Sequence, residues 1–235
     1  TGKDQFLNER SSMNILIIAA HPDDEILGVG GVGARHAANG DNVSALIVAE
    51  GATSRAGGSS DDIEALKNAA QEAAQIIGAA PPVFLGLSDN RLDQMDLLDV
   101  VQLIEGHARE NSPEIVYTHH GGDLNLDHTI VHRSVVTAFR PLPGSSVKKI
   151  YGFETLSSTE WSTPAIGPRF NPNHFVDISG TLEQKLIALD AYKSEMRLFP
   201  HPRSVEAVKH LAGLRGSQAG LNAAEAFEVI LDING

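Results

Sequence analysis

A histidine and three acidic residues directly follow an apolar run near the start of the sequence. The run is Asn14–Ile18, and the polar residues are His21, Asp23, Asp24 and Glu25. Crowding these groups at the end of a buried strand costs free energy unless a positive charge lies among them, and a metal cation is the simplest such charge. A turn can aim His21 and Asp24 at one point, and Asp23 between them could take a proton from a water held there. The stretch therefore predicts part of a metal site, although an acidic first turn of a helix would explain Glu25 alone.

A second polar cluster follows a later apolar run, Glu114–Thr118. Its members are His119, His120, Asp123, Asn125, Asp127 and His128. Because ligands of open α/β sheets bind at the carboxyl ends of strands, we expect the two clusters to meet. A histidine and carboxylate set without thiols suits zinc with an open position for water, and iron or another divalent metal is the alternative. His128 and His132 share a helix face, and either of them would supply the third ligand.

The composition indicates a globular protein with an acidic surface. The 235 residues are 42% hydrophobic, and the net charge is -12. This charge argues against a broad electrostatic grip on nucleic acid or an anionic membrane. The sequence has no cysteine, which excludes disulfides and thiolate metal sites, and no apolar run reaches the ~18 residues of a membrane helix. We therefore predict a cytoplasmic protein with no nucleic-acid or membrane partner.

The segments that must position the two clusters alternate between strand and helix. We predict strands at 14–20, 43–49, 83–85, 114–118, 147–153 and 174–178, and helices at 26–38, 61–77, 97–108, 128–139, 182–196 and from about 205. This alternation predicts a doubly wound α/β fold, with a mostly parallel, Rossmann-like sheet and helices on both faces. Residues 1–12 are expected to be a tag remnant or a disordered tail, which leaves 13–235 as one domain. Residues 155–173, which contain Trp161, are predicted to form a long surface loop.

A glycine-rich stretch offers an alternative class of function. Gly28, Gly30 and Gly33 match the spacing of a dinucleotide-binding fingerprint, and Glu50 lies where a ribose-binding acid is expected. In that fingerprint the first glycine forms the turn at the end of the strand, whereas seven residues separate Ala20 from Gly28 here. The glycines therefore fall within the following helix, where they would permit close packing on the sheet. An NAD-binding oxidoreductase stays as an alternative.

The two clusters together resemble the zinc-dependent PIG-L/LmbE family of N-acetyl-sugar deacetylases. The resemblance lies in His21–Glu25, in Gly121–His128 and in Tyr192–Glu195, and it extends from Met13 to about Phe227. It implies a single deacetylase-like catalytic domain at 13–235, which removes an N-acetyl group from an amino-sugar-containing small molecule. An amidohydrolase with the same metal site, acting on another amide or on a nucleoside-type substrate, is an alternative. A homo-oligomer is left open.

The resemblance also implies roles for individual residues. His21, Asp24 and His128 match the ligands of one zinc ion per chain, and Asp23 matches the general base that activates water. Many relatives have a histidine that stabilises the oxyanion at the position of Asn125. The amide of Asn125 can donate a hydrogen bond to an oxyanion, but it cannot serve as an acid.

The general acid and the substrate contacts are less defined by the resemblance. His132, or one of His119 and His120, could replace the missing acid, and we expect His132 and His120 to contact the substrate. Arg55, in the loop after the second strand, matches a substrate-binding arginine of the family.

Overall fold

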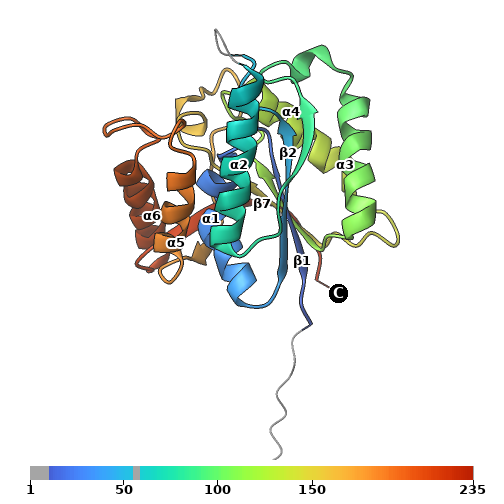
Figure 1. Ribbon diagram of the computed structural model, residues 1–235. Helices are drawn as coiled ribbons and strands as arrows, with labels where there is room; N and C mark the ends of the chain where they lie inside the picture. The colour runs from blue at the N-terminus through green and yellow to red at the C-terminus, as the bar shows by residue number, and fades with distance from the viewer. Residues whose placement is uncertain (1–10, 55–58, 235) are drawn as a thin grey trace, which may run out of the picture.

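The structure is a computed structural model that describes residues 11–54 and 59–234, and its sheet and helices are shown in Figure 1. The strands are β1 (Asn14–Ala19), β2 (Asn42–Ala49), β3 (Val83–Leu87), β4 (Ile115–His119), β5 (Lys149–Phe153), β6 (His174–Asp177) and β7 (Ala224–Asp232). The α-helices are α1 (Asp24–Ala38), α2 (Ser60–Ile77), α3 (Leu97–Asn111), α4 (Leu126–Ala138), α5 (Leu182–Ala191) and α6 (Val205–Ala219). Two short 3-10 helices are η1 (Leu92–Gln94) and η2 (Thr159–Trp161).

The strands form one sheet in the order β3-β2-β1-β4-β5-β7-β6. From β3 to β5 every neighbouring pair is parallel. The predicted doubly wound, mostly parallel sheet is therefore confirmed. The chain runs outward from β1 to β2 and β3, then returns to place β4 on the other side of β1. The carboxyl ends of β1 and β4 consequently meet at the switch point of the sheet, where open α/β folds bind their ligands.

The strand β7 departs from the predicted pattern, which has no strand after the helix from about 205. β7 lies between β5 and β6 and is antiparallel to both. Its sequence is rich in alanine and glutamate, which favour helices in isolation. Pairing on both edges overrides that preference, and Phe227 is fully buried in the strand. The predicted helix at 182–196 is also too long, because α5 ends at Ala191 and turns follow it.

Helices cover both faces of the sheet. α1, α2, α5 and α6 pack on one face, whereas α3 and α4 pack on the other (Figure 1). Alternate residues of β1 point to opposite faces of the sheet. Ile15 and Ile17 pack in the core under α1, and Leu16 and Ile18 pack in the core under α4. A strand that is buried on both faces reads as a continuous apolar run, as β1 does. Among the described residues, no helix combines the length and apolar character needed to span a membrane.

The glycines of α1 lie within the helix, as the spacing predicts. A side-chain carbon on Gly28 would overlap the ring of Phe153, and one on Gly31 would lie 2.9 Å from side-chain atoms of Ile178. These contacts are closer than real side chains tolerate, so the helix approaches the sheet only because glycine occupies both positions. The turn between β1 and α1 contains no glycine, unlike the turn of a dinucleotide fingerprint.

Candidate metal centre

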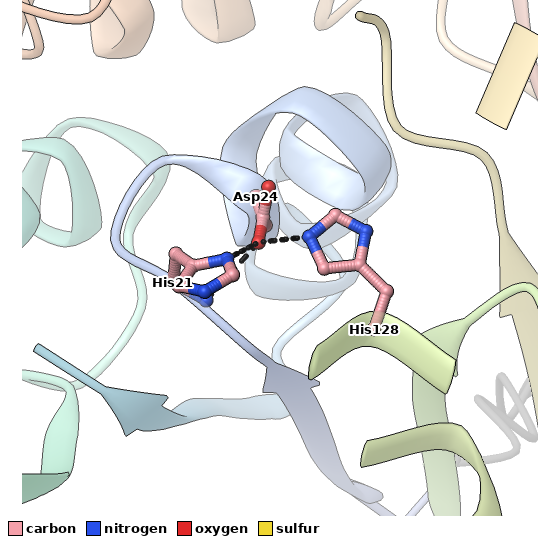
Figure 2. Close-up of side chains that lie close together, drawn as sticks. All are labelled: His21, Asp24 and His128. Atoms are coloured by element: carbon pink, nitrogen blue, oxygen red, sulfur yellow. Dashed lines mark hydrogen bonds and ion pairs between the residues drawn. The ribbon is translucent and has the colours of Figure 1, made fainter. Parts of the chain in front are cut away.

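The carboxyl ends of β1 and β4 bring the two predicted clusters together. The ends are tied by a hydrogen bond of 2.8 Å from the backbone N–H of Ala20 to Nε2 of His119. His21 follows β1, Asp24 begins α1, and His128 lies in the first turn of α4, so three elements contribute to the site (Figure 2). Asp24 Oδ2 lies 3.3 Å from His21 Nδ1 and 3.2 Å from His128 Nε2. The side chains therefore converge on one point.

The chemistry of these three residues fits a metal ion. One ligand atom from each of His21, Asp24 and His128 lies within 4.8 Å of the others, and all three residues are buried. In the described part of the chain, Asp24 Oδ1 and both ring nitrogens of His128 lack a well-formed hydrogen bond. Buried polar atoms without partners are costly, and a cation held between Asp24 and His128 would give Nε2 of His128 a partner. Burial alone would raise the pKa of Asp24, but His128 and His21 hold this pKa well below its usual range.

A second group of possible ligands shares His21 with the first. His21 Nε2 lies 3.1 Å from both Asp89 Oδ1 and Asp127 Oδ2. However, the Asp127 oxygens already accept backbone N–H groups, from Asn90 at 2.8 Å and from Leu92 at 3.1 Å. Asp127 is therefore suited to orienting His21 through Nε2, which leaves Nδ1 to face Asp24 and a metal.

His128 is oriented in a corresponding way by Asp123. Asp123 Oδ1 lies 3.3 Å from His128 Nδ1, on the side of the ring away from Asp24. The Asp123 carboxylate accepts hydrogen bonds from the hydroxyls of Ser158 and Thr159, the latter at 2.5 Å. Burial would raise the pKa of Asp123, but these partners lower it to about 2. Asp123 is thus a fixed anion that keeps His128 Nε2 directed at the metal centre.

Asp23, the predicted general base, is held between a strained backbone and an arginine. Its φ angle is 102°, a conformation that residues other than glycine rarely adopt. Asp23 Oδ2 accepts a hydrogen bond of 2.5 Å from Arg203, whereas Asp23 Oδ1 is buried without a hydrogen-bond partner among the described residues. Burial raises the pKa of Asp23 well above its usual range, although the charge of Arg203 opposes the rise.

Glu25 stabilises the turn that contains Asp23. Its carboxylate accepts hydrogen bonds from the backbone N–H of Asp23 at 3.0 Å and from the hydroxyl of Tyr192. Burial raises the pKa of Glu25 to about 7, although the hydrogen bond from Tyr192 opposes the rise. Glu25 therefore has structural partners, and its contacts extend the site to the segment after α5.

A cavity of about 120 Å³ opens beside these residues. Its lining is mostly polar and consists of His21, Pro22, Asp23, Gly51, Ser54, Asp89, Asn90, Asn125, Glu195 and Arg203. Asn125 begins α4 by accepting a hydrogen bond of 2.9 Å from the N–H of Asp127, and its Nδ2 donates to Asn90 Oδ1 at 3.2 Å. The predicted arginine, Arg55, lies outside the described residues.

The two histidines predicted to contact substrate lie away from this cavity. His120 Nδ1 lies 2.6 Å from Glu228 Oε2, and His120 Nε2 lies 2.9 Å from the carbonyl oxygen of Pro168. His132 Nδ1 lies 2.7 Å from the carbonyl oxygen of His119. The structure therefore brings together His21, Asp23, Asp24, Asn125 and His128, but it does not bring His120 or His132 to the cavity.

Sequence analysis assigned no role to two charged residues of the cavity, Asp89 and Arg203, although it leaves open whether His201–Arg203 lines the mouth of the site or forms a turn before a helix. Asp89 follows β3, and a polar residue at the carboxyl end of a predicted strand was the available signal for it. Arg203 is separated from Asp23 by 180 positions, and no local pattern connects them.

A buried histidine and carboxylate centre at the carboxyl ends of a mostly parallel α/β sheet is typical of a metal-dependent hydrolase. Residues 16–139 match the model of the PIG-L family, described as GlcNAc-PI de-N-acetylase. The chain belongs to this family, and it is accordingly an enzyme of the deacetylase class, which hydrolyses an amide bond. It is also 31% identical over 185 residues to the uncharacterized deacetylase YaiS of Escherichia coli (strain K12), an alignment that covers 77% of this chain and 90% of that protein.

Solved structures share the whole fold. The conserved protein TT1542 from Thermus thermophilus has a TM-score of 0.75 at 25% identity, covering 95% of this chain and 97% of that one. The N,N'-diacetylchitobiose deacetylase of Pyrococcus horikoshii, complexed with its inhibitor MPG, has a TM-score of 0.74 at 20% identity, covering 92% and 83%. The 4-carboxy-2-hydroxymuconate hydratase GalB of Pseudomonas putida KT2440 has a TM-score of 0.73 at 20% identity, covering 95% and 98%. The last two likenesses show the fold alone, and because the activities differ, the reaction has to be argued from the site.

Proposed function

We propose that this protein is a zinc-dependent N-deacetylase of an amino-sugar-containing small molecule. The observation that carries the proposal is the convergence of His21, Asp24 and His128 on one point, next to a polar cavity that His21 and Asp23 line. When bound by these three residues, zinc supplies a Lewis acid for the acetyl carbonyl and lowers the pKa of a water molecule to about 7.

The residues of the chain move the protons. Asp23 Oδ1 has no hydrogen-bond partner among the described residues, so it is the oxygen available to take a proton from the attacking water. The water oxygen forms a bond to the acetyl carbon, and the carbonyl becomes a tetrahedral oxyanion. When the C–N bond breaks, the proton on Asp23 passes to the leaving nitrogen, which gives acetate and a free amine. Because one carboxylate returns the proton it took, this cycle does not require a second acid at Asn125.

The remaining cavity residues orient the substrate. Arg203 holds Asp23 by Oδ2, and its guanidinium lies in the same cavity as Asn125. We assign the Asn125 amide to the oxyanion, since an amide N–H donates to such a group. The polar lining suits the hydroxyl groups of a sugar, and a protein of this fold deacetylates diacetylchitobiose. Arg55 follows Ser54, which lines the cavity, and we retain it as a substrate contact.

A metal analysis paired with an acetate-release screen tests this function. We expect about one equivalent of zinc per chain and release of acetate from N-acetylglucosamine or its glycosides. The variant Asp23→Asn should retain the metal and lose at least ~100-fold in kcat, because a general base contributes about 10²–10⁴ in rate. The exposed Asp99→Asn serves as a control and should match the wild type.

Three results would contradict parts of this proposal. Wild-type turnover by Asp23→Asn would remove the base assignment. Amide hydrolysis confined to substrates without an amino sugar would favour the alternative amidohydrolase. Tight NADH binding by a metal-free protein would favour the oxidoreductase.

A further inference from the structure

We propose that Trp161 is a stacking platform for the part of the substrate beyond its N-acetylated ring, an inference that rests on the proposed deacetylase function. The ligand chemistry is a flat apolar face joined to the amino sugar, either a second sugar ring or an aromatic aglycone. Trp161 is the only tryptophan of the sequence, and its side chain is 50% exposed. An indole offers a large rigid surface for stacking, and this surface contributes binding free energy only when another group covers it.

The segment that carries Trp161 is fixed to the metal centre. The hydroxyls of Ser158 and Thr159 donate to Asp123, the residue that orients His128. The preceding residue, Ser157, accepts a hydrogen bond of 2.8 Å from Nε of Arg203. Trp161 lies in the same short helix as Thr159, η2, so its position is set by contacts to the site itself.

Trp161 also contacts the turn at 197–203, which carries Arg203 of the cavity. The rings of Trp161 and His201 meet edge to face, with centroids 6.2 Å apart and planes at 84°. The turn is closed by a hydrogen bond of 2.9 Å from the N–H of Arg197 to the carbonyl of Arg203. At its tip, Leu198 is 89% exposed, and the neighbouring Phe199 is 54% exposed. Large apolar side chains are therefore exposed both on η2 and on this turn, whereas the cavity is lined mostly by polar groups.

The size of the cavity indicates what this apolar surface contacts. At about 120 Å³, the cavity is smaller than the ~300–1,000 Å³ of pockets that enclose a whole small ligand. It can hold the acetamido group and part of its ring, so the rest of a larger substrate extends past the cavity. Ser157, which precedes η2, is hydrogen-bonded to Arg203 of the cavity, and the ring of Trp161 contacts His201, two residues before Arg203. From these two links we infer that Trp161 lies near the mouth of the cavity.

Turnover of matched substrates tests the platform. The substrates are N-acetylglucosamine, its β-1,4-linked dimer and its p-nitrophenyl β-glycoside. We expect Trp161→Ala to lower kcat/KM for the dimer or the aryl glycoside by about 3- to 10-fold, the range of one aromatic contact, mostly through KM. The monosaccharide should change by less than about 2-fold, and Trp161→Phe should keep part of the preference. Leu142→Ala is the matched control, since Leu142 is 60% exposed in the loop that leads to the amino end of β5, whereas the site lies at the carboxyl ends of the strands.

The single tryptophan provides a second readout that does not depend on turnover. Glucosamine and its β-1,4-linked dimer are deacetylated products, so the wild-type holoenzyme can be titrated with them at equilibrium. We expect the dimer to shift or quench the emission of Trp161 and the monosaccharide to leave it nearly unchanged. Substitution of Leu142 should not alter this response.

The outcomes separate failure of the inference from failure of the proposed function. Acetate release from all three substrates with equal losses in Trp161→Ala would overturn the platform alone. Emission that stays unchanged at concentrations of the deacetylated dimer that fully inhibit turnover would do the same. No acetate release from any of them by the wild-type holoenzyme would overturn the proposed function. A lower mass of Trp161→Ala in sedimentation would overturn the platform in favour of a subunit interface.

Discussion

At the scale of single residues, the site depends on histidines that use their two ring nitrogens for different contacts. His21 presents Nδ1 to Asp24 and Nε2 to Asp127, whereas His128 presents Nε2 to Asp24 and Nδ1 to Asp123. In each ring a second carboxylate fixes the nitrogen that carries the proton. The other nitrogen is then free to bind a cation, so in the proposed zinc site the two outer aspartates would orient the two histidine ligands.

We predict that Asp123→Asn weakens zinc binding by about 10- to 100-fold, because partners of ligating histidines contribute affinity of this size. The amide keeps the shape of the carboxylate, but it loses the charge that holds the His128 Nδ1–H. Competition with a chromophoric zinc chelator measures the change. The exposed Asp93→Asn should bind zinc like the wild type. Equal affinity in Asp123→Asn would show that His128 is oriented without this carboxylate.

The predicted site residues that the structure brings together are those with a local pattern in the sequence. His21, Asp23 and Asp24 follow an apolar strand directly, and Asp123 to His128 repeat this arrangement after β4. Arg203 could not be found in this way, since it enters the cavity on a turn far along the chain. His120 was predicted to contact substrate from its place after β4, but its side chain pairs with Glu228 instead. Strand ends thus identify where a site lies better than which side chains face it.

At the scale of elements, the glycine-rich helix α1 is contacted by a buried ion pair from two other elements. Lys185 Nζ lies 2.6 Å from Glu225 Oε1 and donates to the carbonyl of Leu27 at 2.7 Å. Glu225 accepts the N–H groups of Gly31 at 2.9 Å and Val32 at 2.7 Å. In a regular helix the carbonyl of Leu27 would pair with the N–H of Gly31. Lys185 of α5 and Glu225 of β7 therefore bind backbone groups of α1 that would otherwise pair with each other. These groups lie in α1 shortly after Asp24, which begins the helix.

We predict that Gly28→Ala destabilises the protein by about 1–3 kcal/mol, because the added carbon would overlap the ring of Phe153. Gly106→Ala in α3 is the control, since no atom lies within 4 Å of the added carbon there. It should stabilise the protein by about 0.4–1 kcal/mol, as glycine to alanine does in an unstrained helix. Urea unfolding of the two variants measures both changes. A neutral Gly28→Ala would mean that the helix can move away from the sheet.

Periodicity predicted the elements of the parallel half of the sheet, but it did not predict β7. The parallel strands are buried on both faces and read as apolar runs. β7 carries Glu225 and Glu228, and each of these acids has a partner on a distant element, Lys185 or His120. The sequence alone does not show those partners, so the two acids favour the prediction of a helix or an exposed segment instead of a buried strand.

At the scale of the whole molecule, the pair between His120 and Glu228 joins the end of β4 to the antiparallel strand. Burial would lower the pKa of His120, but the hydrogen bond to Glu228 raises it above 6.5. Burial would raise the pKa of Glu228, but His120 holds it below 4.5. The histidine contributes stability that is present below pH 6.5 and is lost as the pH rises through its folded pKa. The glutamate contributes stability that is present above pH 4.5 and is lost as the pH falls through its folded pKa.

We therefore predict that Glu228→Gln destabilises the protein more at pH 6 than at pH 9. The difference should be about 1 kcal/mol, the typical net contribution of one hydrogen bond to stability. Glutamine can still accept the N–H of Asn171, which Glu228 accepts at 2.8 Å, so that contact is retained. Thermal melts at the two pH values measure the difference, and the exposed Glu183→Gln should show none. A penalty that is the same at both pH values would show that His120 does not change its charge between them.

The order of the strands has a consequence for synthesis on the ribosome. Among the described strands, β6 pairs with β7 alone, and β7 follows it by way of α5 and α6. The first five strands can pair as they emerge, but β6 has to wait until β7 has been made. Glu225 and Glu228 are both synthesised with β7. The backbone of α1, which Glu225 binds, and His120, which pairs with Glu228, therefore gain their partners at the same stage. A nascent chain halted before Ala224 would carry both halves of the metal centre on an unfinished sheet, with β6 still unpaired.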